Sequence, residues 1–262
     1  MSIKNESYVV PMYGTCMLPN NIQELKLLIA KCCTEITALE KEFFAKEYKD
    51  DLNMNEEKSN EEYSNECIPI TEDVRTFDFT KLANSHKAIT GQLFDVIMMD
   101  PPWRIASSSP TRGVTIAYDT LKDKEIKALN IPCLQDVGFL FIWTVNSKLQ
   151  FSLLLLEEWG YRYCDQICWI KQSNHKKIFK GNGYYLQHSR ETCLIGVKGD
   201  PWKRANVNVK ADSIFSVRRG QSQKPDEIYE LIEALIPNGY YIEIFGRRNN
   251  LRSGWVTIGN EL

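Results

Sequence analysis

Apolar and polar residues alternate in blocks along the chain, and the blocks from residue 68 onward predict an α/β domain. Continuous apolar runs bounded by polar turns predict buried strands at 94–99, 138–143, 166–170, 192–197, 240–245 and 255–258. Between these strands, apolar residues recur with helical spacing, which predicts helices at 122–129, 147–159 and 225–235. This alternation predicts a mostly parallel sheet covered by helices on both faces, with ligands bound at the carboxyl ends of its strands.

The first 47 residues carry a different pattern. Asn20 and Asn21 are typical of a helix N-cap. Apolar residues then recur at alternating steps of three and four, as in three heptads: Ile22, Leu25, Ile29, Cys32, Ile36, Leu39 and Phe43. Two interpretations stay open, a helix that packs on its own domain and a helix over 22–43 that docks on a partner protein.

Residues 48–66 are rich in Asp, Glu, Asn and Ser and have almost no apolar side chain that drives packing. This composition predicts a flexible acidic linker. The expected organisation is therefore an N-terminal segment at 1–47 with a partner-docking helix, a linker at 48–67 and a globular domain at 68–262.

Composition narrows the class of protein. The 262 residues are 43% hydrophobic, yet no apolar run reaches the roughly 18 residues of a membrane span. The N-terminus has no secretory pattern, so we expect a nuclear or cytosolic protein, with the nucleus favoured. None of the eight cysteines forms a CxxC pair, so we expect no metal site.

Charge is divided unevenly along the chain. Residues 1–70 hold 7 Lys/Arg and 13 Asp/Glu, a formal charge of -6, which leaves +4 for residues 71–262. The second part is thus mildly basic, which is compatible with nucleic acid but weaker than is usual for a protein that grips it alone.

The run Asp100-Pro101-Pro102-Trp103 directly follows a predicted strand and carries the candidate chemistry. Two prolines fix the backbone and offer only carbonyl acceptors, while the aspartate adds a charged acceptor. Two acceptors on an aromatic amine localise its lone pair, which is otherwise delocalised into the ring. The Asp100 carboxylate and the Pro101 carbonyl suit the N6 amine of adenine, and Trp103 offers a surface for base stacking.

The chain resembles the eukaryotic mRNA adenine-N6 methyltransferase family, whose hallmark is this DPPW run. The resemblance covers about Asp73 to Leu262. It includes Leu129-Asn130-Ile131-Pro132, Gly138 to Trp143, Trp159-Gly160-Tyr161, Gly196 to Gly199, Lys224 to Tyr229, Glu243 to Arg247 and Trp255 to Asn260. It implies a Rossmann-like class I methyltransferase fold with permuted motif order, in which the catalytic motif precedes the main cofactor motif.

The resemblance also implies the residues around the cofactor S-adenosyl-L-methionine. They are Asp73, Val74, Asp100, Lys224, Glu243, Phe245, Arg247, Asn249, Asn250, Asn260 and Glu261. Asn249 and Glu261 depart from the family's usual His and Gln. The catalytic group is expected to be Asp100, Pro101, Pro102 and Trp103.

Two loops are expected to form the substrate pocket, at 104–119 and 171–190. The first ends at Tyr118, which matches a family tyrosine near the acceptor base. His188, in the second loop, and Glu191, just after it, match family positions near the acceptor adenosine. Lys176, Lys177 and Lys180 lie in the second loop, where solvation and phosphate contact are equal alternatives.

The zinc fingers of the mRNA enzymes have no counterpart here, since the chain has only three histidines and none forms a finger. The resemblance is therefore closest to the ciliate branch that methylates DNA adenine as a complex, and DNA is favoured over RNA. Its implied partners are a related methyltransferase-like subunit and additional DNA-binding subunits. The alternatives are the same reaction on RNA and a non-catalytic scaffold subunit.

Overall fold

The computed structural model describes residues 67–105, 120–181, 185–209, 212–218 and 223–262. The predicted helix at 22–43, the acidic linker before residue 67 and Tyr118 lie outside the described residues, so these predictions stay predictions. Within the described ranges, no helix has the length and apolar character that a membrane crossing requires.

Eight strands form one sheet in the order β1-β8-β7-β2-β3-β5-β4-β6. All neighbouring pairs are parallel except the two that involve β5. The strands are β1 (Ile68–Thr71), β2 (Val96–Met99), β3 (Gly138–Thr144), β4 (Arg162–Gln172), β5 (Arg190–Lys198), β6 (Ser213–Val217), β7 (Tyr241–Ile244) and β8 (Trp255–Gly259). The expected α/β, Rossmann-like fold with a mostly parallel sheet is confirmed.

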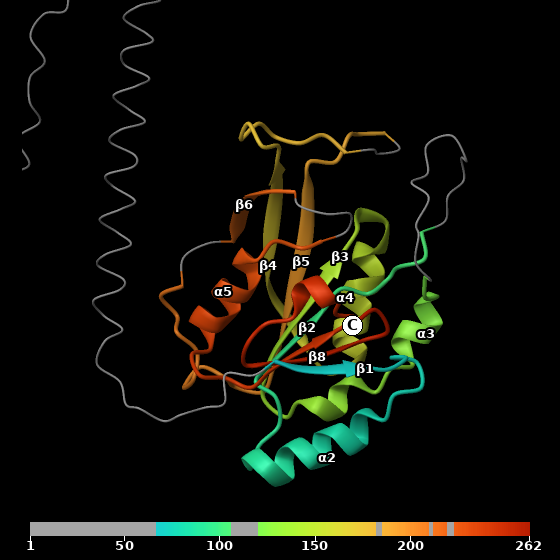
Figure 1. Cartoon of the computed structure of the whole chain (residues 1–262), viewed down its shortest axis with the longest axis vertical. Coiled ribbons are helices and arrows are strands. Elements are labelled where there is room, and N and C mark those ends of the chain that lie inside the picture. Colours follow the sequence, from blue (N-terminus) through green and yellow to red (C-terminus); the bar gives the residue numbers. More distant parts are fainter. Residues whose placement is uncertain (1–66, 106–119, 182–184, 210–211, 219–222) are drawn as a thin grey trace, which may run out of the picture. The chain divides into compact units, whose positions relative to one another are not determined.

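Helices cover both faces of the sheet (Figure 1). They are α2 (Phe79–Thr90), α3 (Asp123–Lys127), α4 (Leu149–Glu158) and α5 (Glu227–Leu235), with short 3-10 turns η1 (Ile131–Leu134), η2 (Asn146–Lys148) and η3 (Arg248–Asn250). Strand β2 shows how the two cores form. Ile97 and Met99 pack in the cluster that α2, α3 and α4 cover, whereas Val96 and Met98 pack in the cluster under α5.

Three elements have no counterpart in the sequence prediction. Helix α2 buries only Phe79 and Ala83, which is too little apolar periodicity for a pattern search. Strands β1 and β6 lie at the two ends of the sheet, where one flank has no neighbouring strand among the described residues. Strand β1 is mostly exposed and β6 has one buried residue, so neither shows a continuous apolar run.

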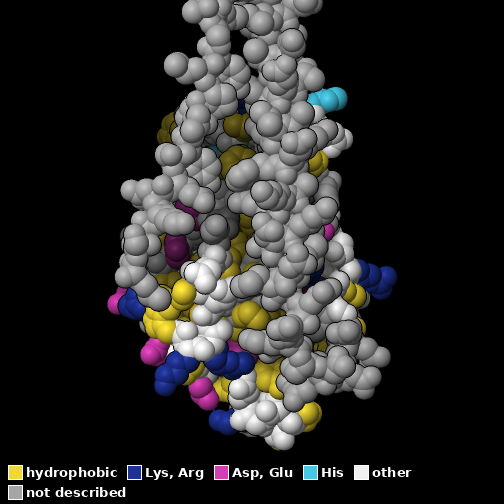
Figure 2. All heavy atoms as spheres, turned by 90° about the vertical axis from the view of Figure 1, so that its left-hand side faces the viewer, with side chains coloured by type: hydrophobic (Ala, Val, Ile, Leu, Met, Phe, Trp, Pro, Cys, Tyr) yellow, Lys and Arg dark blue, Asp and Glu magenta, His cyan; other side chains and the backbone are white. Residues whose placement is uncertain are grey.

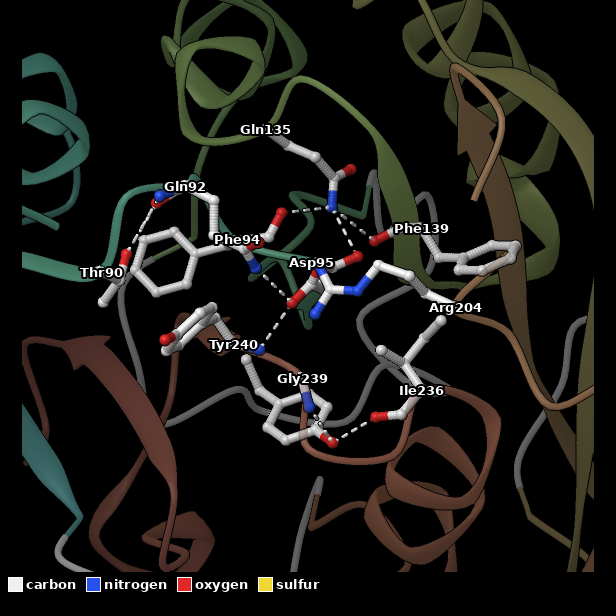
Figure 3. Close-up of polar contacts among 11 residues, drawn as sticks. Thr90, Gln92, Phe94, Asp95, Gln135, Phe139, Arg204, Ile236, Gly239 and Tyr240 are labelled. Atoms are coloured by element: carbon white, nitrogen blue, oxygen red, sulfur yellow. Dashed lines mark hydrogen bonds and ion pairs between the residues drawn. The ribbon is translucent and has the colours of Figure 1, made fainter. Parts of the chain in front are cut away.

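A buried polar cluster ties together the amino ends of the central strands (Figure 3). Asp95, just before β2, accepts the backbone N–H of Tyr240 at 2.8 Å and contacts the Arg204 guanidinium. The Gln135 side chain donates to the carbonyls of Phe94, Asp95 and Phe139 at 2.8–3.3 Å. A Cβ at Gly138 would lie 2.1 Å from the Asp95 carbonyl, so only glycine allows this close approach.

Candidate active site

Four adjacent parallel strands end at one pocket. The pocket lies at the carboxyl edge of β1, β8, β7 and β2, opposite the Asp95 cluster. Its lining is Asp73, Val74, Arg75, Asp100, Pro102, Leu121, Phe245, Gly246, Arg247, Asn260 and Glu261. Seven of the residues expected around the cofactor from the sequence are among them: Asp73, Val74, Asp100, Phe245, Arg247, Asn260 and Glu261. The sequence prediction therefore brought together segments that lie almost 190 residues apart.

Asp100 begins the loop after β2, and a buried lysine holds its carboxylate. Lys224 Nζ lies 2.7 Å from Asp100 Oδ2 and 3.3 Å from Glu191 Oε2, and the Lys224 side chain is only 8% exposed. Lys171, at the end of β4, contacts the other Glu191 oxygen. Antiparallel pairing of β5 with β3 and β4 is what brings Glu191, near the start of β5, to this edge.

Lys224, Lys171, Asp100 and Glu191 form an ion network, and its two carboxylates keep Lys224 protonated. Burial lowers the pKa of Lys224, but the Asp100 and Glu191 carboxylates outweigh it and raise that pKa above the ordinary value. Burial raises the pKa of Glu191, yet Lys224 and Lys171 together hold it at about 2. Burial raises the pKa of Asp100, and the Lys224 ammonium opposes that rise. Lys224 is thus the cation that keeps Asp100 available as a charged acceptor.

The carbonyl oxygens of the DPPW run are already engaged on one side. The Pro101 oxygen accepts the Trp103 N–H at 2.8 Å, and the Pro102 oxygen accepts the Leu121 N–H at 2.8 Å. A carbonyl oxygen has two lone pairs, so the Pro101 oxygen retains the capacity to accept a second bond. Of the two prolines, Pro102 lines the pocket, whereas Pro101 is buried.

Trp103 does not present a stacking face in this structure, which corrects the expectation from the sequence. The side chain is 5% exposed, and its indole N–H donates to the Trp143 carbonyl at 3.0 Å. Its ring meets Phe151 edge-on, with centroids 6.1 Å apart. Trp103 therefore packs the DPPW loop against β3 and α4, a role that a short motif cannot distinguish from base stacking.

The pocket-lining loop after β7 begins with a strained residue. Phe245 has a φ of 68°, a left-handed conformation that costs a non-glycine residue about 1–2 kcal/mol. At Gly246, a Cβ would lie 2.1 Å from Thr257 Cγ2 and 3.3 Å from Glu243 Oε2, so only glycine fits. Arg247 pairs with Glu261 at 3.2 Å, which joins the ends of β7 and β8 across the pocket.

Glu243 and Asn250 are placed behind this loop, outside the pocket lining. Glu243 is 2% exposed and lies in β7, where its Oε1 accepts bonds from Tyr229 Oη and Asn250 Nδ2, both at 3.0 Å. Asn249 is exposed and does not line the pocket. Sequence reasoning did not single out Tyr229, Lys171 or the pocket-lining Arg75. Two of them had a signal, since Tyr229 lies in the quoted run Lys224 to Tyr229 and Lys171 begins the expected loop 171–190.

The residues expected to meet a substrate fall into two groups. Glu191 lies in the ion network, and His188 Nδ1 is 3.3 Å from Asn146 Nδ2, just after β3. Lys176, Lys177 and Lys180 are exposed on the connection between β4 and β5, which extends beyond the sheet in Figure 1. Within the described part of the chain, no cluster of three His, Cys, Asp or Glu is arranged to hold a metal ion.

Comparison with known proteins shows that the part of the chain that contains most of this site is similar to one protein family. The model of the MT-A70 family matches residues 94–261. The human N(6)-adenosine-methyltransferase catalytic subunit METTL3 is 42% identical over 171 residues, which cover 64% of this chain and 28% of that protein. The Drosophila melanogaster N(6)-adenosine-methyltransferase MT-A70-like protein is 37% identical over 192 residues, 72% of this chain and 29% of that protein.

A non-catalytic relative also matches. The Drosophila melanogaster N(6)-adenosine-methyltransferase non-catalytic subunit METTL14 is 31% identical over 192 residues, which cover 66% of this chain and 47% of that protein. The chain thus spans less than a third of the length of the METTL3 and MT-A70-like relatives and about half of the METTL14 relative.

Proposed function

Because the chain belongs to the MT-A70 family, we propose that it transfers a methyl group from S-adenosylmethionine to the N6 amine of adenine in a nucleic acid. The observation that carries the proposal is the placement of Asp100. Its carboxylate lines a pocket at the carboxyl edge of the sheet and is held by Lys224, a buried cation. This is where an open parallel sheet binds its ligands.

S-adenosylmethionine is the methyl donor of MT-A70 methyltransferases, so the cofactor expected from the sequence is confirmed at the level of the family. The pocket has the groups that such a molecule needs. Phe245 supplies an apolar ring, while Asp73, Arg247 and Asn260 supply polar groups suited to ribose hydroxyls and base nitrogens. The Asp100 carboxylate suits the ammonium of the methionine end. When bound, the cofactor supplies an electrophilic methyl group.

The residues of the chain bind and orient the acceptor amine. The Asp100 carboxylate and the second lone pair of the Pro101 carbonyl accept the two N–H bonds of the amine, which turns its lone pair toward the donor. Methylation would release one proton from the amine, and the Asp100 carboxylate is placed to accept it. Lys224 holds Asp100 in place throughout.

The acceptor we propose is adenosine in RNA, with adenine in DNA as the alternative. The relatives named above are called N(6)-adenosine-methyltransferases, and adenosine is the ribonucleoside. Their names therefore support RNA better than the DNA preference that the missing zinc fingers suggested. Exposed Lys176, Lys177 and Lys180 are the candidate phosphate contacts.

We further propose that the chain works with a related methyltransferase-like subunit. The likeness to a relative named as a non-catalytic METTL14 subunit supports such a pairing. Where described residues are visible in Figure 2, near the lower end of the face drawn, Lys/Arg and Asp/Glu side chains lie beside one another, which also supports the proposal. A surface of this kind adds little affinity for phosphates, so a partner would supply part of the grip.

The test is methyl transfer from labelled S-adenosylmethionine to RNA and DNA oligonucleotides of matched sequence, using the full chain copurified with its partners. Digested products are identified as N6-methylated nucleosides, and Asp100→Ala serves as the control. We expect label on RNA adenosine that disappears in the variant. Label on DNA alone would reverse the substrate, and label that persists in the variant would make this chain a non-catalytic subunit.

A further inference from the structure

Two buried side chains, Tyr229 and Glu243, and the partly buried Asn250 form a closed polar network behind the loop 245–250. Tyr229 of α5 donates its hydroxyl to Glu243 Oε1 at 3.0 Å. Asn250 Nδ2 donates to the Tyr229 oxygen at 2.8 Å and to Glu243 Oε1 at 3.0 Å. The network thereby connects a helix, a central strand and the 3-10 turn that ends the loop 245–250.

The loop needs such support because its conformation is not intrinsically favoured. It starts at Phe245 in a left-handed conformation, and its next two residues, Gly246 and Arg247, line the pocket. The Gly246 N–H is held by the Ile258 carbonyl at 2.9 Å, and Asn250 N–H by the Arg247 carbonyl at 2.8 Å. Strained backbone persists only where its surroundings hold it, and the Asn250 side chain ties the far end of this loop to Tyr229 and Glu243.

We propose that Tyr229 and Glu243 are positioning residues, which lock Asn250 and the strained loop 245–250 into the shape that lines the cofactor pocket. This inference rests on the proposed function insofar as it names the ligand of the pocket. It replaces the direct cofactor contact expected of Glu243 from the sequence, because Glu243 lies behind Gly246 rather than in the lining.

The environment of Glu243 explains how a carboxyl can serve as an anchor. Both donors reach Oε1, and Oε2 has no hydrogen-bond partner among the described residues. Burial raises the pKa of Glu243 to about 8, with Tyr229 and Asn250 opposing, Asp100 adding to the rise and Lys224 opposing it. A neutral carboxyl therefore prevails at pH 7, with Oε1 as acceptor, and a glutamine side chain reproduces that arrangement.

The experiment measures the dissociation constant of S-adenosylmethionine by calorimetry for the full chain and four variants at pH 7. We expect Tyr229→Phe and Glu243→Ala to weaken binding by roughly five- to tenfold, the effect of one or two lost hydrogen bonds. Glu243→Gln should stay within about twofold of the wild type, because it keeps the acceptor. In methyl transfer, KM for the cofactor should rise while kcat changes little.

Tyr241→Phe is the matched control. It also removes a buried tyrosine hydroxyl from the same part of the fold, but that hydroxyl binds Ile236 and Gly239 at the other end of β7. We expect it to leave cofactor affinity unchanged. Loss of affinity in Glu243→Gln equal to that in Glu243→Ala would mean that an ionised carboxylate contacts the ligand, and would overturn the inference.

Hydrogen exchange of the protein without cofactor provides an independent readout. Tyr229→Phe should speed exchange of the amides at 246–250, whereas Tyr241→Phe should not. Unchanged exchange and unchanged cofactor affinity in Tyr229→Phe would refute the positioning role of Tyr229. If Tyr229→Phe does not fold, the comparison of Glu243→Gln with Glu243→Ala decides. Failure of the wild type to bind S-adenosylmethionine would contradict the proposed function. The exchange data would still test whether Tyr229 holds the loop 245–250 in place.

Discussion

Strand β2 has an aspartate at each end, and the two differ in their surroundings: Asp95 is buried, whereas the Asp100 side chain is 25% exposed. Asp95 precedes the strand and Asp100 follows it, so they lie only four residues of extended chain apart. Burial raises the pKa of both carboxyls. Asp95 is 6% exposed and is surrounded by partners from the chain itself: Tyr240 N–H, Gln92 and Arg204.

Asp100, in contrast, has Lys224 as the side-chain partner that holds it among the described residues, and it also lines a pocket. Lys224 binds Oδ2, and the residues around it belong to the pocket lining or the ion network. The comparison teaches that burial of an acid is a poor sign of function by itself. What distinguishes Asp100, for which we propose a function, is that its fixed partners leave room for a ligand.

The largest expected effect is on the rate of methyl transfer, and it comes from a change at the carboxyl end of β2. Asp100→Asn keeps the size of the side chain but weakens the acceptor and loses the Lys224 pairing. We expect methyl transfer to fall by roughly 100- to 1000-fold, as for loss of one preorganised electrostatic group. Single-turnover rates would show it, with circular dichroism to verify folding. A rate within threefold of the wild type would remove Asp100 from the chemistry.

Substitution of the cation gives the next effect. Lys224→Met preserves length and apolar packing but removes the charge that opposes the raised pKa of Asp100. That pKa then rises further, so fewer molecules carry an ionised Asp100 at pH 7. We expect transfer to fall by on the order of 100-fold at pH 7 and to recover partly toward pH 9. A profile that is merely scaled down at every pH would argue against this account.

Asp95→Ala is the corresponding change at the amino end of β2. It leaves the Tyr240 N–H and the Arg204 guanidinium without their partner, although Arg204 is nearly half exposed and solvent restores part of the loss. The free energy of unfolding should fall by about 2–3 kcal/mol, while the transfer rate per folded molecule stays near the wild type. Urea denaturation tests the predicted loss of stability. A methyl-transfer rate measured at 15 °C tests the prediction that activity per folded molecule is unchanged.

The last expected effect concerns the pH dependence of stability, with little change in activity at pH 7. Glu243 has a pKa of about 8 in the folded protein, against an ordinary value of 4.5. Between these values the folded state keeps a proton that the unfolded state has lost, so this group makes stability fall as pH rises from 5 to 8. The slope is at most about 1.4 kcal/mol per pH unit, and Glu243→Gln should remove it.

Glu191→Gln is the control for that prediction. The pKa of Glu191 is lowered to about 2, so its contribution is complete above pH 5 and is lost only as pH falls below 4.5. Its replacement should change the stability but leave the slope between pH 5 and 8 as it is. Equal slopes for the wild type and Glu243→Gln would show that Glu243 is not held neutral.

Strands were predictable from the sequence where burial on both faces produced continuous apolar runs, as in β2, β3 and β7. Edge strand β6 was not, since Phe215 is exposed and Ile214 buried, and alternation over five residues is ambiguous. Helix α2 carries cap signals, with Asp78 binding the Lys81 N–H and Gly91 in a left-handed conformation, but its apolar face is too sparse.

The sequence allowed prediction of residues that line the pocket or pair beside it, but not of the side-chain orientations that support them. Asp100 and Lys224 lie in runs that resemble a known family, and the structure joins them by an ion pair. The inward orientation of Trp103 and the anchoring of Asn250 by Tyr229 depend on which way each side chain turns. No linear pattern encodes that, because Tyr229 satisfies the apolar spacing of α5 equally well as a packing residue.

The most direct test of the central claim is a crystal structure of the full chain, with its partner subunit, bound to S-adenosylhomocysteine. The account predicts the product in the pocket at the carboxyl edge of β1, β8, β7 and β2. Its adenosine should contact Phe245 and Asn260, its amino acid end should face Asp100, and Glu243 should remain bonded to Tyr229 and Asn250. A product bound elsewhere on the chain, or only on the partner, would contradict it.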